Sequence, residues 1–364
     1  MSQARAEDAG PRGSSHPSLP RRFRFAPTPS RPLHIGSAWA ALVGWSLARL
    51  DAGRFVLRIE DIDRTRSQAQ FENQLLSDLA WLGLDWDEGP DVGGPFGPYR
   101  QSERLHLYDQ ALEDLARRGH LYACLCSRAE IRQAQSAPHL GPNLGEAERP
   151  YPGTCRPPHP TTTPHSALLP DRGGLRLSLP TLARGTEITF EDTLAGRDTD
   201  PDHPESPARL REDLASTCGD VLLGRPGQPT YQLAVVVDDL AMDISDVVRG
   251  RDLLGSTARQ LALVEALTGR PPTLRHTHHG LVVDADGRKL SKRDQAAPLA
   301  ELRHLGPARL IAALGRAAGY FATDVHTASA RDLADAIAHN RLRLACDLPA
   351  SLVLEHLAQP GAHA

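Results

Sequence analysis

The stretch RFAPTPSRPLHIGS, residues 24–37, decides how the N-terminal part of this chain folds. It starts inside an apolar run closed by prolines and leads into an Ala-rich segment at helical spacing, Ile35–Leu50. This order predicts a strand, Phe23–Thr28, that gives way to a helix. Free N–H groups and the positive end of the helix dipole at the start of this helix would favour binding of a phosphate. Gly36 would let a ligand approach the backbone closely, and His34 would add a hydrogen-bond donor. Alone, the pattern also fits an ordinary turn before a core helix.

The segments that follow repeat this alternation. Phe55–Ile59 predicts a second strand and Ser67–Leu82 a second helix. Further on, the near-continuous apolar run Tyr231–Val237 predicts a strand buried on both faces. A helix at Ser256–Leu267 and a strand at Leu274–His279 complete a second half. Strands alternating with helices predict an α/β fold with a Rossmann-type parallel sheet in two halves, interrupted by an insertion.

The composition is that of an ordinary globular chain. Its 364 residues are enough for one large domain or two medium ones, with 40% hydrophobic and 24% charged residues. No apolar run approaches the roughly 18 residues that span a bilayer, and no signal peptide is visible, so we expect no membrane association. The net charge of −4 excludes a DNA-coating protein but leaves a local basic surface for RNA open. Five cysteines, an odd number, indicate a reducing compartment, and we expect a cytoplasmic protein.

Lysine is almost absent from the chain. Of the 41 basic residues only Lys289 and Lys292 are lysine, and they lie three positions apart in Lys-Leu-Ser-Lys-Arg. Chance or an ordinary solvated loop would explain the string by itself. A functional interpretation is that both positions need a compact, mobile ammonium, which Arg does not replace. Two such groups suit the charge that develops on a triphosphate during displacement.

The two segments together are far more specific than either alone. His-x-Gly near the N-terminus with Lys-x-Ser-Lys after the second half-sheet resembles the double signature of class I aminoacyl-tRNA synthetases. Other segments resemble the glutamate-specific branch: Phe25–Gly36, Leu57–Asp63, Leu79–Trp86, Tyr231–Asp239 and Val247–Leu254. The resemblance extends over about residues 23–320 and implies that branch's fold and a ligase activity.

The segment after Arg293 has 71 residues and looks helical. A full glutamyl-tRNA synthetase continues with a large anticodon-binding part, which we do not expect this segment to hold. The better match is the truncated glutamyl-Q tRNA(Asp) synthetase family. That resemblance implies an enzyme that activates L-glutamate with ATP, a chemistry that implies Mg²⁺, and we expect a monomer. It also implies transfer of glutamate to the queuosine base in the anticodon of tRNA(Asp).

The resemblance also implies residue roles. Arg24 would face a substrate carboxylate and Glu60, closing the second strand, the substrate's ammonium. The expected glutamate-binding set is Arg24, Phe25, Ala26, Pro27, Thr28, Glu60, Tyr231 and Arg249. The expected ATP-binding residues are His34, Gly36 and Lys292, and the expected catalytic ones His34, Lys289 and Lys292.

Three cysteines in Cys124-Leu-Cys126 and Cys155 indicate an incomplete tetrahedral metal site. The family resemblance implies Tyr151, in Tyr-Pro-Gly-Thr-Cys, as fourth ligand of one structural Zn²⁺. Three free thiols without a metal are the other interpretation. Alternative fourth ligands are His120, His139 and His159.

The expected organisation has five parts. They are a disordered tail (1–22), the first catalytic half (23–123), a zinc-binding and connective insertion (124–215), the second half with the lysine loop (216–293) and a helical C-terminal segment without an anticodon-binding domain (294–364).

Three other functions stay open at this point. A true glutamyl-tRNA synthetase with a reduced C-terminal part would activate glutamate only with tRNA. A non-catalytic, synthetase-like RNA-binding protein would lack ATP-dependent chemistry. A nucleotidyltransferase acting on another small acid would share His-x-Gly, but it would not need Arg24, Glu60, Tyr231 and Arg249 together.

Overall fold

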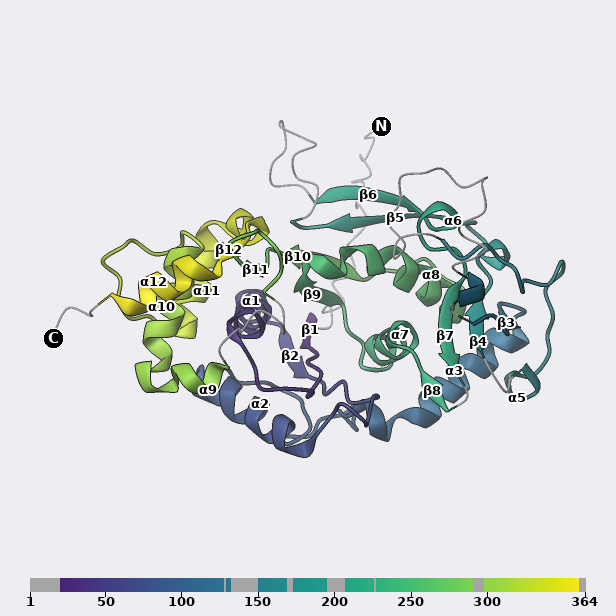
Figure 1. Ribbon diagram of the computed structural model, residues 1–364, viewed down its shortest axis with the longest axis horizontal. Helices are drawn as coiled ribbons and strands as arrows, with labels where there is room; N and C mark the ends of the chain where they lie inside the picture. Colours follow the sequence, from purple (N-terminus) through teal and green to yellow (C-terminus); the bar gives the residue numbers. More distant parts are fainter. Residues whose placement is uncertain are drawn as a thin grey trace, which may run out of the picture.

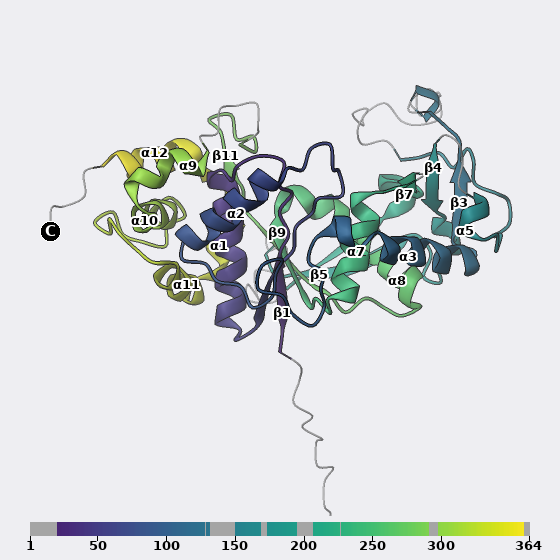
Figure 2. The same cartoon turned by 90° about the horizontal axis from the view of Figure 1, so that it is seen from below.

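The computed structural model describes residues 20–127, 129–131, 150–168, 173–194, 207–225, 227–290 and 298–359. A parallel sheet occupies the middle of an elongated molecule, with the C-terminal helices at one end and a second sheet at the other (Figures 1 and 2). Among the described residues no helix is long and apolar enough to cross a membrane.

The central sheet has six strands, and five of them run parallel. Only the edge strand β6 is antiparallel to its neighbour. In spatial order the strands are β2 (Arg54–Leu57), β1 (Arg22–Phe25), β9 (Asp246–Gly250), β10 (Arg275–His279), β5 (Glu187–Asp192) and β6 (Ala208–Asp213).

Two strand–helix–strand units make the core of this sheet. Helix α1 (Ile35–Leu50) connects β1 to β2, and α8 (Thr257–Thr268) connects β9 to β10. Because β1 and β9 are neighbours while their units extend in opposite directions, the strand order reverses between them. A ligand crevice forms at such a switch point, beyond the carboxyl ends of the strands. The predicted Rossmann-type parallel sheet in two halves is therefore confirmed.

The prediction for Tyr231–Val237 is wrong: this run is not a strand but the first part of helix α7 (Tyr231–Ala241). Thr230 caps the helix, since its side chain accepts a bond from the Leu233 amide. Every residue from Leu233 to Asp239 is buried, so nearly the whole surface of this helix is covered. A helix that is buried on all sides lacks the polar face that gives a helical period. Its continuous apolar run then resembles that of a buried strand.

The predicted insertion, residues 124–215, contributes strands to two sheets. Its β5 and β6 extend the central sheet, while β4 belongs to a separate antiparallel sheet. That second sheet runs, in spatial order, β3 (Leu121–Cys124), β4 (Gly174–Leu177), β7 (Val221–Arg225) and β8 (Gln228–Pro229). The remaining helices up to this point are α2 (Ala69–Trp81), α3 (Leu105–Arg117), α5 (His165–Leu168) and α6 (Leu214–Thr217).

The C-terminal segment is helical, as expected. Its helices are α9 (Leu299–Leu302), α10 (Pro307–Ala317), α11 (Ala330–His339) and α12 (Ala350–Ala358). A short parallel pair, β11 (Val282–Val283) and β12 (Leu348–Pro349), ties them to the catalytic half. At the other end of the chain, Arg22 already belongs to β1, and residues 1–19 of the expected tail lie outside the described residues.

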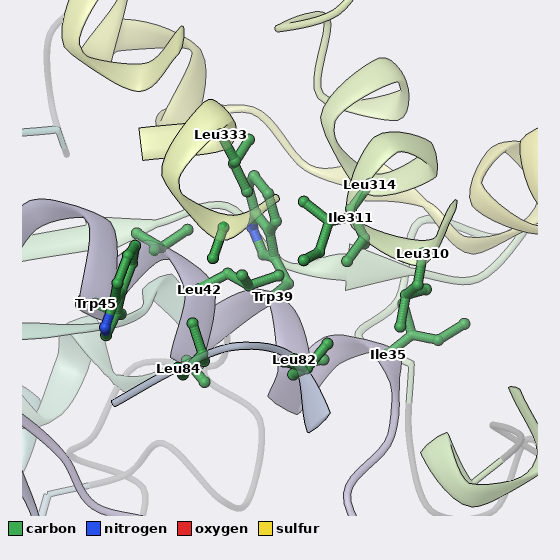
Figure 3. Close-up of a cluster of buried hydrophobic side chains, with 14 of the residues drawn as sticks. Ile35, Trp39, Leu42, Trp45, Leu82, Leu84, Leu310, Ile311, Leu314 and Leu333 are labelled. Atoms are coloured by element: carbon green, nitrogen blue, oxygen red, sulfur yellow. The ribbon is translucent and has the colours of Figure 1, made fainter. Parts of the chain in front are cut away.

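The largest core cluster joins α1 to these C-terminal helices (Figure 3). Trp39 and Leu42 of α1 are fully buried and share the cluster with Leu310, Leu314 and Leu333. Since α1 also begins at the switch point, this packing fixes the helix whose first turn faces the crevice.

We therefore predict that Leu333→Ala lowers the free energy of unfolding by about 2–5 kcal/mol, because it opens a cavity in that cluster. Urea denaturation followed by circular dichroism measures the change. Leu354→Ala is the matched control: Leu354 lies in α12, is 47% exposed, and should change stability by less than about 0.5 kcal/mol. Equal losses in the two variants would contradict the proposed role of the cluster.

Candidate active site

A cavity of about 620 Å³ opens where the strand order reverses. It lies against residues that follow β1, β9 and β10, and against the first turn of α1. All the residues expected to bind glutamate or ATP or to act in catalysis, so far as the structure describes them, line it: Arg24, Phe25, Ala26, Pro27, Thr28, His34, Gly36, Glu60, Tyr231, Arg249 and Lys289. Lys292 lies outside the described residues. Segments more than 200 positions apart in the sequence thus meet in one cavity.

His34 caps helix α1 from the cavity side. Its Nδ1 accepts a bond of 3.1 Å from the Gly36 amide, so in the neutral ring the proton belongs on Nε2, which lies 3.3 Å from Ser37 Oγ. A Cβ on residue 36 would come within 3.0 Å of His34 Cε1. Gly36 therefore makes room for the capping imidazole as well as for a ligand.

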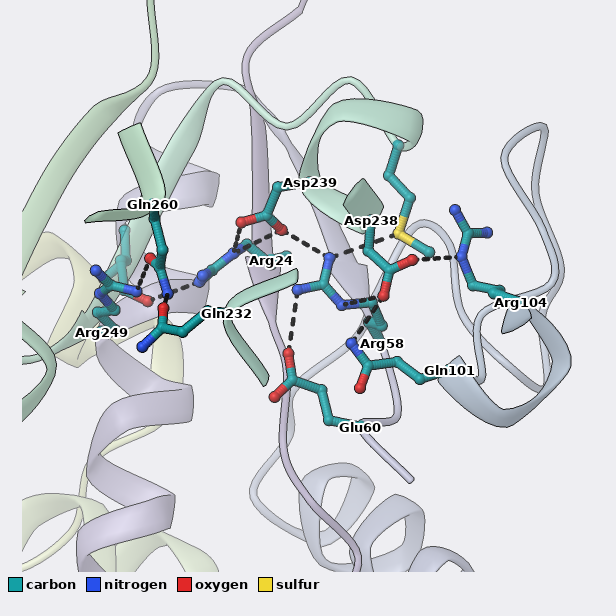
Figure 4. A network of polar contacts seen from close by, with 12 residues as sticks. Arg24, Arg58, Glu60, Gln101, Arg104, Gln232, Asp238, Asp239, Arg249 and Gln260 are labelled. Carbon is teal, nitrogen blue, oxygen red and sulfur yellow. Dashed lines mark hydrogen bonds and ion pairs between the residues drawn. The ribbon is translucent and has the colours of Figure 1, made fainter. Parts of the chain in front are cut away.

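Arg24 and Arg58 are held by a single carboxylate, Asp239 (Figure 4). Arg58 Nη1 donates to Asp239 Oδ1 at 2.6 Å, and Arg24 Nε donates to the same oxygen at 3.2 Å. Arg24 also donates to the Val248 carbonyl of β9 at 3.2 Å. Burial alone would raise the pKa of Asp239, but the two guanidinium groups outweigh it and hold that pKa below its ordinary value.

Glu60 lines the cavity, and the guanidinium of Arg58 lies between the carboxylates of Glu60 and Asp239 (Figure 4). Its Oε1 accepts from Arg58 Nη2 at 3.2 Å. Burial raises the pKa of Glu60 above its ordinary value, although Arg58 and Arg24 oppose this. A positively charged ligand group would compensate the buried carboxylate further.

Arg249 lies beside Tyr231 at another part of the cavity wall and is almost fully buried. Its three nitrogens donate to neutral acceptors: His278 Nε2, Gln260 Oε1 and Thr257 Oγ1 at 3.0, 2.7 and 2.8 Å. Two arginines, a tyrosine hydroxyl and a buried carboxylate around one cavity suit a ligand that carries both an acidic and an ammonium group.

At the mouth of the cavity, Lys289 Nζ pairs with Asp252 of the 3-10 helix η4 (Arg251–Ser256) at 2.5 Å. The Lys289 side chain is about half exposed, so a polyanion can reach it from solvent.

The four expected metal ligands come together away from the cavity, around the end of β3. The sulfurs of Cys124, Cys126 and Cys155 lie within 4.8 Å of one another, and Tyr151 Oη lies 3.3 Å from Cys124 Sγ. A tetrahedral ion with Zn–S bonds of about 2.3 Å separates its sulfurs by about 3.8 Å, so this group fits such an ion. Arg176 stacks on the Tyr151 ring at 3.7 Å.

The other candidate ligands do not join this group. His120 Nδ1 is bonded to Thr181 Oγ1, His159 is exposed and outside the cluster, and His139 lies outside the described residues. Burial would raise the pKa of Cys124, but hydrogen bonds with Tyr151 and Arg176 outweigh it and lower that pKa. The geometry of the three thiols, rather than any one pKa, makes this cluster a candidate metal site, and Tyr151 Oη lies beside it.

Sequence reasoning missed the residues behind the cavity wall. Arg58 gives the clearest signal, since an arginine inside the apolar run Phe-Val-Leu-Arg-Ile needs a buried carboxylate partner. Asp239 belongs to a quoted motif, but nothing in its spacing shows that it meets Arg24. His278 and Asp192 carry no local signal.

The comparisons with known proteins agree with this geometry. The family model of the catalytic domain of class I tRNA synthetases (E and Q) matches residues 21–317. The chain belongs to this family. Its members are ligases, and Mg²⁺ with ATP is typical of them. The matched range includes every described residue of the cavity.

Relatives within this synthetase family include enzymes of two names. The chain is 48% identical over 285 residues to a glutamyl-Q tRNA(Asp) synthetase of Symbiobacterium thermophilum, covering 78% of this chain and 81% of that one. It is 42% identical to the protein of that name from Nitratidesulfovibrio vulgaris, covering 78% and 82%. A glutamate–tRNA ligase of Anaeromyxobacter dehalogenans is 41% identical, covering 78% of this chain and 54% of that one. The resemblance seen in the motifs is confirmed.

The solved structures support the fold. A glutamate–tRNA synthetase of Elizabethkingia anophelis superimposes with a TM-score of 0.70 at 24% identity, covering 93% of this chain and 70% of that one.

The buried ion pairs give a prediction for stability. Arg58→Met should cost about 3–5 kcal/mol of unfolding free energy, because it leaves the buried carboxylate of Glu60 without its paired guanidinium and Asp239 with Arg24 alone. Arg54→Met is the control: that side chain is 56% exposed, and losing its pair with Asp87 should cost less than about 1 kcal/mol. Urea denaturation of both variants measures the difference, and a mild effect of Arg58→Met would refute a structural role for this network.

Proposed function

We propose that this synthetase activates L-glutamate with ATP and transfers it to the queuosine base in the anticodon of tRNA(Asp). The observation that carries the activation step is the single cavity that holds two arginines, a tyrosine, a buried glutamate and the capped start of α1. The acceptor is supported by the higher identity to proteins named glutamyl-Q tRNA(Asp) synthetase than to those named glutamate–tRNA ligase.

In the first step the α-carboxylate of glutamate attacks the α-phosphorus of ATP. A P–O bond to the carboxylate forms, the bond to pyrophosphate breaks, and glutamyl-adenylate results. No protein nucleophile is needed, since positioning and charge stabilisation suffice. Arg24, Tyr231 and Arg249 would bind the side-chain carboxylate of glutamate, and Glu60 would bind its ammonium group. The backbone of residues 25–28 would complete the wall of the cavity.

The ATP phosphates would lie at the N-terminus of α1. There the Nε2–H of His34 would donate to a phosphate oxygen in place of Ser37 Oγ, because the cap engages only Nδ1. Lys289 and Lys292 would stabilise the charge that develops on pyrophosphate. Lys289 would exchange its pair with Asp252 for a phosphate oxygen. In the second step a queuosine hydroxyl attacks the glutamyl carbonyl, and AMP leaves.

The test is pyrophosphate exchange into ATP with glutamate, with and without tRNA, followed by transfer of labelled glutamate. We expect exchange without tRNA, and labelling of tRNA(Asp) only when it carries queuosine. Unmodified tRNA(Asp) and tRNA(Glu) serve as controls. Exchange that requires tRNA, with labelling of tRNA(Glu), would instead favour a glutamyl-tRNA synthetase. No exchange in either condition would refute the activation step.

We also propose that Cys124, Cys126, Tyr151 and Cys155 hold one structural Zn²⁺. Bound there, zinc would tie β3 to the segment at residues 151–155. Purified protein should contain about one zinc per chain by elemental analysis, and Cys126→Ser should lose it, because removing one thiolate leaves an incomplete tetrahedral site. Cys346→Ser is the control, since Cys346 is exposed and outside the cluster. Metal-free protein with unchanged thermal stability would contradict the proposal.

A further inference from the structure

Arg249 differs from Arg24 in how its charge is compensated. Arg24 donates to the carboxylate of Asp239, whereas Arg249, among the described residues, donates to three neutral acceptors. Three of its five N–H donors are used in this way. Arg249 is 6% exposed, and burial lowers its pKa, which is the signature of a cation without a direct anionic partner.

One of these neutral acceptors is itself held by a carboxylate. His278 of β10 accepts from Arg249 Nε through its Nε2 at 3.0 Å. Its Nδ1 lies 2.5 Å from Asp192 Oδ2 at the end of β5. Both side chains are completely buried. Asp192, His278 and Arg249 therefore form a chain across three adjacent strands.

The bond from Arg249 leaves one arrangement for the ring, in which Thr257 Oγ1, 3.1 Å from the same Nε2, also faces its lone pair. Arg249 Nε always carries a proton, so His278 Nε2 must offer its lone pair, and the ring proton must lie on Nδ1, facing Asp192. Burial lowers the pKa of His278, with Asp192 opposing and Arg249 reinforcing the shift, which keeps the ring neutral. Without Asp192 the proton could move to Nε2 and would then face the Nε–H of Arg249.

We infer that Asp192 and His278 are positioning residues that orient Arg249 toward the substrate carboxylate without pairing with it directly. This rests on the proposed glutamate activation. A direct carboxylate partner would compete with the substrate for the guanidinium, whereas a neutral imidazole fixes the side chain and leaves its charge to an anionic ligand. Recognition of the acid over its uncharged amide, glutamine, would follow from that charge.

Two substitutions at one position separate this role from general stability. His278→Leu removes the acceptor for Arg249, whereas His278→Gln offers a carbonyl oxygen near the place of Nε2. Both leave Asp192 without its ring partner, so both should lose stability. In pyrophosphate exchange we expect His278→Leu to raise the KM for glutamate about tenfold or more with a smaller change in kcat, because a bond to a charged group is lost. His278→Gln should recover most of that loss.

The matched control is His276. It lies two residues earlier on β10, is as deeply buried as His278 and stacks on its ring at 6.0 Å, but no bond joins it to Arg249. We expect His276→Leu to keep the KM for glutamate within about twofold despite any loss of thermal stability. A KM that rises equally in His276→Leu and His278→Leu, or no rescue by glutamine, would overturn the inference.

A second measurement does not depend on activity. In ¹⁵N-labelled wild-type protein, the imidazole signals that disappear in His278→Gln report the tautomer of this ring. We expect a neutral ring protonated at Nδ1 in the wild type and a shift toward Nε2 protonation in Asp192→Ala. An imidazolium or an Nε2-protonated ring in the wild type would overturn the inference. Failure of wild-type exchange with glutamate would refute the proposed function alone.

Discussion

The cavity wall depends on the carboxylate of Asp239, which Arg24 and Arg58 share. Three ionised groups buried this deeply are unfavourable unless each finds an opposite charge. Asp239 lies in helix α7, Arg24 lies in β1, and Arg58 directly follows β2. The buried charges are therefore compensated only when all three elements are in place. The same contacts orient Arg24 and Glu60 toward the cavity. The ion pairs that make the burial of these charges favourable therefore also set the geometry of the site.

The family resemblance predicts the residues that line the cavity, and their motifs lie in strands or at strand and helix ends. Arg24 lies in β1, Glu60 follows the mostly apolar run that begins at Phe55, and His34 precedes a helix whose start is marked by glycine. Such positions converge at a switch point whatever the length of the intervening chain. The fold class followed from the same alternation, although Tyr231 was placed at the start of a strand, because apolar content alone does not separate a buried helix from a buried strand.

The residues behind the wall could not be predicted in this way. His278 meets Asp192 across 86 positions, and Arg58 meets Asp239 across 181. Neither pair has a fixed spacing, since the partners come from different strands and helices whose pairing order is a property of the sheet. The sequence shows that Arg58 needs a buried anion, but only the packing of α7 shows which one it receives.

The adjacency of β1 and β9 also has a consequence for how the protein is made. Arg24 donates to the carbonyl of Val248, 224 positions further along the chain. Contacts between such distant residues form late, because a long loop must close before they contribute. On the ribosome, Arg24 of the first strand would stay without its native partners until more than two hundred further residues, including Asp239, had been translated.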